Sequence, residues 1–104
     1  MSRIFAALLS SLMLAGFATA AGAADAANGQ TLAKRWCAAC HVVAADQTKG
    51  NTQAPPFSAI AATPGLTAAS LALFLLTPHP KMPDMNLSRA EAADLAEYIK
   101  SQGK

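Results

Sequence analysis

Both cysteines of the chain lie in one short stretch, Trp36-Cys37-Ala38-Ala39-Cys40-His41, and one of its two histidines follows the second cysteine directly. Three kinds of chemistry use thiols at this spacing. A C-x-x-C pair can be a redox-active dithiol, usually beside a β-α-β unit. Cysteine and histidine side chains can also bind zinc. The C-x-x-C-H order is, in addition, the attachment pattern of c-type haem.

The order of these residues favours covalent haem. Two thiols about one helical turn apart can each form a thioether with a porphyrin vinyl group, and the next imidazole can bind the iron from the same face. A dithiol oxidoreductase is disfavoured because the pair would close a helix and no strand is predicted. A four-ligand zinc site would need His79 and also two adjacent residues, Cys40 and His41, on one tetrahedral ion.

The amino-terminal residues have the order of a secretory signal peptide. Arg3 precedes an apolar run over residues 4–18, and small residues follow. This order is typical of a cleaved signal. We therefore expect a signal peptide at 1–24, cut within 20–24, and one exported domain at 25–104 in the periplasm. An uncleaved membrane anchor is the alternative, and no second apolar run is long enough to span a bilayer.

The composition of the expected mature chain limits its function. A domain of about 80 residues has a small core and usually needs a disulfide, a metal or another staple, which a bound haem would supply. Of the eight basic residues, seven remain without Arg3, and they stand against six acidic ones. This near-neutral balance, with no basic run and few aromatic residues, argues against nucleic-acid binding.

Three segments have the apolar spacing of helices, and no segment alternates with the period of a strand. They are 25–40, 68–76 and the stretch after Ser88 to about Gly103. In the second segment, Thr67 can act as the N-cap and Pro78 ends the helix. In the third, Ser88 and Glu91 form an S-x-x-E capping box. We expect irregular structure at 42–62 and 78–86.

Taken together, these motifs resemble class I monohaem cytochromes c over nearly the whole mature chain. The resemblance rests on CAACH, on Ala-Pro-Pro-Phe at 54–57, on the proline-rich segment 79–85 and on the final amphipathic helix. It implies an all-α, cytochrome c-like fold of about three helices around one covalently bound haem c. Cys37 and Cys40 would form the two thioethers, and His41 would be one axial ligand of the iron.

The resemblance also implies a second axial ligand, for which three residues compete: Met82, Met85 and His79. Met82 is favoured because Pro83 follows it and because it lies sixteen residues before Tyr98, as the family's methionine does. A methionine ligand closes the iron to other molecules and raises the reduction potential, which suits electron transfer.

Three further residues receive roles from the resemblance. The carbonyl of Pro55, or alternatively Pro56, would accept a hydrogen bond from the His41 ring and fix its orientation. Trp36 would pack beside the haem, or would donate its indole N–H to a propionate. Gly29 would lie where the amino- and carboxy-terminal helices cross, because a residue without a Cβ lets two backbones approach.

The expected function is that of a periplasmic electron-transfer protein with one c-type haem and His/Met ligation, and not that of an enzyme. Its partners would be redox donors and acceptors, such as a periplasmic dehydrogenase or a terminal oxidase. Lys34 and Lys81 could steer acidic partners. We expect a monomer with no membrane span after signal cleavage. One alternative is a dedicated haem c subunit of a periplasmic oxidoreductase, which would carry an apolar docking patch. Another is a ligand-binding or peroxidatic haem protein, in which Met82 would not bind iron.

Overall fold

The computed structural model describes residues 23–50, 54–77 and 81–103, and within these ranges the chain forms four α-helices. They are α1 (Ala26–Trp36), α2 (Phe57–Ala61), α3 (Ala68–Leu76) and α4 (Arg89–Ser101). No described residue belongs to a β-strand, so the all-α prediction is confirmed. Residues 1–22 of the predicted signal peptide, and His79, lie outside the described residues. In those same ranges, no helix has both the length and the apolar character needed to cross a membrane.

The helix starts predicted from capping residues are confirmed. The Thr67 hydroxyl accepts a hydrogen bond from the Ser70 N–H at 3.0 Å, and α3 covers the predicted residues. At α4, the Glu91 N–H donates to the Ser88 hydroxyl at 3.0 Å and the Glu91 carboxylate accepts from the Ser88 N–H at 2.9 Å. Each capping box satisfies backbone groups that the first turn of a helix leaves without partners.

The first helix is shorter than its sequence pattern predicts. It was expected to reach Cys40 but ends at Trp36, with Cys37 as the C-cap. The N–H groups of Cys40 and His41 both point back to the Cys37 carbonyl, at 3.1 and 2.9 Å. The chain therefore turns tightly after α1 instead of continuing as a helix, and the two thiols lie on this turn.

The second helix was not predicted, because its five residues fell in a segment expected to be irregular. Pro56 is the N-cap of α2 and has an extended backbone, with a φ of −64° and a ψ of 152°. The proline ring favours this φ, and the helix begins at the next residue. Such a short helix shows no periodic pattern in the sequence. It is held by tertiary packing through Phe57, which is 3% exposed.

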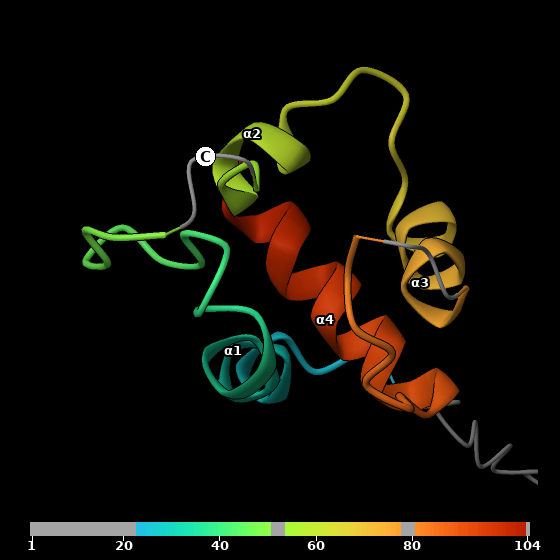
Figure 1. Ribbon diagram of the computed structural model, residues 1–104. Coiled ribbons are helices and arrows are strands. Elements are labelled where there is room, and N and C mark those ends of the chain that lie inside the picture. Colours follow the sequence, from blue (N-terminus) through green and yellow to red (C-terminus); the bar gives the residue numbers. More distant parts are fainter. Residues whose placement is uncertain (1–22, 51–53, 78–80, 104) are drawn as a thin grey trace, which may run out of the picture.

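Helix α4 is the element against which the other three pack (Figure 1). The face of α4 predicted to be apolar is buried, since Leu95, Tyr98 and Ile99 are all at most 5% exposed. The core also takes side chains from α1, α2, α3 and the loop after α1. These side chains are Leu32, Ala33, Val43, Phe57 and Leu71, and α4 itself adds Ala92 and Ala96.

Helices α1 and α4 cross at Gly29, as predicted. A Cβ built on Gly29 would lie 2.1 Å from the Asp94 carbonyl oxygen, so no other residue fits there without moving a backbone. The Asp94 carboxylate strengthens the crossing by accepting hydrogen bonds from the Asp25 N–H at 2.7 Å and from the Asn28 side-chain amide at 2.8 Å. The start of α1 is thus fixed to the middle of α4.

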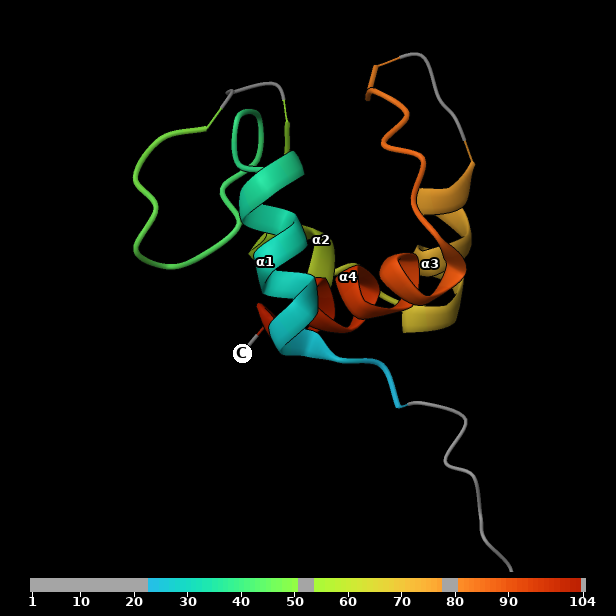
Figure 2. The same cartoon turned by 90° about the horizontal axis from the view of Figure 1, so that it is seen from below.

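This crossing determines which segments share one side of the molecule. Figure 2 shows that the carboxyl end of α1 and the segment from residue 81 into α4 both extend to the same side of α4, on opposite flanks of it. The turn that follows the end of α1 carries the two cysteines and His41, and the segment from residue 81 carries Met82 and Met85. The fold therefore brings the two ends of the predicted site to one side of the central helix.

Candidate functional site

The two thiols of the attachment turn differ in exposure and in proton affinity. Cys37 is half-buried, Cys40 is exposed, and neither forms a disulfide. Burial, together with the nearby Cys40 thiol, raises the pKa of Cys37 to about 11. Redox-active C-x-x-C pairs have a lowered thiol pKa, and they lie at the amino end of a helix. Here the pKa of Cys37 is raised, and the two thiols follow the carboxyl end of α1, which disfavours the dithiol hypothesis.

A zinc site finds no support in the described ranges. Among residues 23–50, 54–77 and 81–103, no three side chains of His, Cys, Asp or Glu gather closely enough to hold a metal ion. A structural zinc site needs about four such ligands. The fourth residue of the hypothetical zinc set, His79, is outside those ranges.

The ring of His41 is held by the backbone of Pro55. Its Nδ1 lies 2.6 Å from the Pro55 carbonyl oxygen. A carbonyl can only accept, so Nδ1 carries a hydrogen in this contact, and in the neutral imidazole the lone pair is then on Nε2. No described residue forms a hydrogen bond with Nε2. Pro56, the alternative, instead caps α2.

This donor set fits a haem. Two free thiols lie on one turn, and the neighbouring imidazole presents an unprotonated nitrogen whose orientation a carbonyl fixes. That arrangement is the usual one for an imidazole bound to a metal, because the hydrogen bond at one nitrogen selects the tautomer and raises the basicity of the other. The residues Cys37, Cys40 and His41 would hold the group.

Behind His41, an aromatic pair connects the site to α4. The ring centroids of His41 and Phe57 are 5.5 Å apart, and those of Phe57 and Tyr98 are 6.2 Å apart in an edge-on arrangement. The Tyr98 hydroxyl donates to the carbonyl of the fully buried Val43 at 2.7 Å. Although the sequence pointed to the Ala-Pro-Pro-Phe segment, the role of Phe57 became visible only in the structure.

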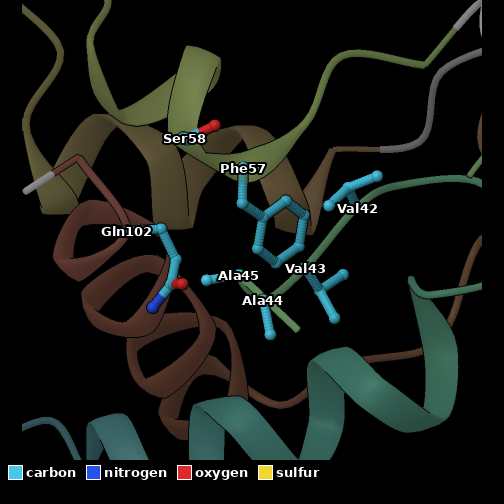
Figure 3. Close-up of a pocket in the computed structure, with 7 residues that line it drawn as sticks. All are labelled: Val42, Val43, Ala44, Ala45, Phe57, Ser58 and Gln102. Atoms are coloured by element: carbon cyan, nitrogen blue, oxygen red, sulfur yellow. The ribbon is translucent and has the colours of Figure 1, made fainter. Parts of the chain in front are cut away.

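A hollow of about 240 Å³ opens beside Phe57 (Figure 3). It is lined by Val42, Val43, Ala44, Ala45, Phe57, Ser58 and Gln102. None of these residues carries a thiol, an imidazole or a thioether, and the lining does not include Cys37, His41 or Met82. It is therefore not the place where the chemistry of the CAACH motif would act.

Tyr98 is expected to ionise only at a pH above 10.0, its ordinary pKa. Burial raises its pKa, a hydrogen bond with the Gln30 side chain lowers it, and the Asp46 charge raises it. Because the pKa is higher in the folded state, the stability that the neutral phenol contributes is complete below pH 10.0 and is lost as the pH rises through the folded-state pKa.

The chain contains one tyrosine, so an NMR titration of protein labelled with ¹³C-tyrosine reads Tyr98 alone. A midpoint at or below 10.0 would contradict this assignment of its environment.

Trp36 lies at the end of α1 and is not enclosed by the protein core. It remains 43% exposed, and the Arg35 guanidinium carbon lies 4.8 Å from its ring centroid, as in a cation–π contact. Leu32, four residues earlier on α1, is 8% exposed, so this side of α1 is buried at Leu32 but not at Trp36. Trp36 thus offers an aromatic face next to Cys37.

Of the three candidates for the second axial ligand, the structure describes two. Met82 and Met85 are both half-buried, in a segment that leads into α4. The Asn86 N–H donates to the Asp84 carboxylate at 2.9 Å, and Asn86 has a φ of 52°, a conformation that asparagine tolerates. This turn joins the methionine segment to the Ser88 cap.

Sequence reasoning missed Gln47, whose side chain lies in the loop after His41. Its amide forms hydrogen bonds with four backbone groups between Ala38 and Lys49. No sequence pattern predicts such a role for a glutamine in a polar loop, because these hydrogen bonds depend on how the loop folds back.

Comparison with known proteins agrees with the geometry. The profile of the cytochrome c family matches residues 26–103. Cytochrome c-552 of Bradyrhizobium diazoefficiens is 51% identical over 90 residues, which cover 86% of this chain and 86% of that protein. No solved structure gives a significant match. With its CAACH turn and its α1–α4 crossing, the chain belongs to the cytochrome c family, as a class I monohaem member that carries one covalently bound haem c.

Proposed function

We propose that the protein is an exported electron carrier in which Cys37 and Cys40 hold the haem and His41 and Met82 bind its iron. Family membership supports haem-based electron transfer in general. The observation that carries the finer proposal is the 2.6 Å contact between the His41 Nδ1 and the Pro55 carbonyl, because it leaves the other ring nitrogen available as a ligand.

The bound haem c supplies the exchange of a single electron between Fe²⁺ and Fe³⁺. The chain supplies a rigid frame around it. The Pro55 carbonyl holds the His41 ring, and the hydrogen bond from the Asn86 N–H to the Asp84 carboxylate stabilises the turn between Met82 and the start of α4. Because hydrogen bonds restrain both ligand-bearing segments, we propose that little moves when the charge of the site changes. Such a site transfers electrons without binding or converting a substrate, so we propose a carrier and not an enzyme.

The partners we propose are redox proteins of the periplasm, such as a dehydrogenase or a terminal oxidase. Lys34 and Lys81 are both exposed and belong to the two segments that flank the site. They can attract acidic partners at long range and raise association rates at low ionic strength. We propose no role in nucleic-acid binding, and we propose that the carrier is a monomer.

One observation favours the alternative, a dedicated haem c subunit of a periplasmic oxidoreductase. Leu73 is 67% exposed and Leu76 is 37% exposed, three residues apart on α3, which bears no charged side chain. Exposed apolar side chains on an uncharged helix are a feature of surfaces that dock a partner. A carrier purifies alone, whereas a dedicated subunit elutes in size-exclusion chromatography with a second chain.

The attachment proposal is tested with the exported protein and the variants Cys37→Ala, Cys40→Ala and their double. In the wild type, haem should stay with the chain in acid–acetone. In each single variant one thioether should remain and the absorption bands should shift, because one vinyl group is restored. In the double variant the haem should extract completely.

Intact mass spectrometry of the same samples reports haem attachment and the proposed cleavage within 20–24 together. Haem that extracts from the wild type would overturn the attachment. A mass that still includes the signal peptide would overturn only the proposed cleavage.

A further inference from the structure

The Gln47 side chain gathers four backbone groups around the attachment turn. Its Nε2 lies 3.0 Å from the Ala38 carbonyl oxygen, 2.8 Å from that of His41 and 2.7 Å from that of Lys49. Its Oε1 accepts from the Val43 N–H at 2.9 Å. Since an amide has two N–H hydrogens, at least one of them is shared between carbonyls. The side chain is half-buried, so these bonds are partly shielded from water.

The end of α1 explains why these carbonyls need a partner. The last carbonyls of a helix and of the turn after it have no N–H groups of their own helix to accept from. The helix stops at Trp36, and the Ala38 and His41 carbonyls come after that point. The Gln47 amide is the donor that the chain brings back to them.

The loop also packs tightly against the peptide of His41. A Cβ built on Gly50 would lie 3.1 Å from both the Cys40 carbonyl oxygen and the Val42 nitrogen. The backbone on each side of His41 is therefore enclosed by the returning loop. Val43, two residues after His41, connects this backbone to α4, because its carbonyl accepts a hydrogen bond from the Tyr98 hydroxyl.

We propose that Gln47 is a positioning residue for the axial ligand His41, an inference that rests on the proposed ligand role of His41. The imidazole is held at both ends: the Pro55 carbonyl fixes the ring, and the Gln47 amide fixes the backbone from which the ring projects. With both ends fixed, the torsions of His41 between backbone and ring are restrained. Gln47 thereby sets the orientation of the imidazole plane.

The test compares Gln47→Leu with the matched control Gln102→Leu in the holoprotein. Gln102 is also half-buried, but its side-chain amide donates only to the Ser101 hydroxyl, at 3.1 Å, among the described residues. The readout is the pattern of hyperfine-shifted haem methyl and His41 ring resonances in the ¹H NMR spectrum of the oxidised protein. That pattern depends on imidazole orientation and not on stability. Gln47→Leu should change it, and Gln102→Leu should leave it as in the wild type.

A wild-type measurement covers the case in which Gln47→Leu yields no holoprotein. The side-chain amide protons of Gln47 should exchange with solvent about tenfold more slowly than those of Gln102, because opening them breaks hydrogen bonds to several carbonyls. Equal exchange rates would overturn the proposal. So would a Gln47→Leu protein that unfolds more easily but keeps the wild-type hyperfine pattern. A wild type with no hyperfine-shifted resonances would instead reject the haem site itself, and the positioning role with it.

Discussion

Replacing Gly29 with alanine is expected to lower the free energy of unfolding by about 3 kcal/mol, near the upper end of the usual cost of overpacking. The added Cβ would lie 2.1 Å from the Asp94 carbonyl oxygen, 2.6 Å from the carbonyl carbon and 2.7 Å from the Tyr98 Cβ. All three atoms belong to α4, in its backbone or at the root of a side chain, so no flexible group can move aside. The two helices would have to separate.

The sign of the effect distinguishes this contact from helix propensity. On an exposed helix, alanine in place of glycine stabilises by about 1 kcal/mol, so propensity alone predicts a gain. Denaturant unfolding of the holoprotein, followed by circular dichroism, measures the change. An unchanged or more stable Gly29→Ala protein would mean that α1 and α4 do not approach closely at this residue.

Gly65 provides the control for glycine replacement. It has a φ of +75° and no heavy atom within 4 Å of a built Cβ, so alanine there meets strain but no clash. The cost of a non-glycine residue in this conformation is about 1 kcal/mol. Gly65→Ala should therefore be clearly less destabilising than Gly29→Ala.

The second large effect is expected for Met82→Ala, which removes the proposed sulfur ligand of the iron. The weak far-red sulfur-to-iron absorption band of the oxidised protein should disappear. The reduction potential should fall by on the order of 0.1 V or more, a fraction of the roughly 0.8 V over which axial ligands tune haem. The reduced protein should also gain the ability to bind carbon monoxide at neutral pH, because one axial position becomes open.

Met85→Ala is the matched control, since Met85 is also half-buried and lies in the same segment. It should keep the far-red band and the potential of the wild type. Loss of the band in Met85→Ala alone would transfer the ligand role to Met85. A wild type that has haem but no such band would point to His79 or to an external ligand, and would revive the ligand-binding alternative.

Features that depend on a few neighbouring residues could be predicted from the sequence. Thr67 and Ser88 form hydrogen bonds with residues three positions further on, so the starts of α3 and α4 followed directly from their capping motifs. The CAACH motif is likewise local, because its chemistry requires two thiols and an imidazole in a fixed order. The crossing at Gly29 followed from the family resemblance, which supplied the long-range pairing that local patterns lack.

The sequence by itself determined the haem chemistry, the all-α class and two helix starts, because each is encoded within one or two turns of chain. The tertiary structure alone decided where α1 ends, that Phe57 begins a short α2, and how the His41 site is enclosed. Gln47 reaches back nine residues to Ala38, and Tyr98 reaches Val43 across 55 residues. Contacts between distant residues depend on the path of the whole chain, and no local spacing of residue types records that path.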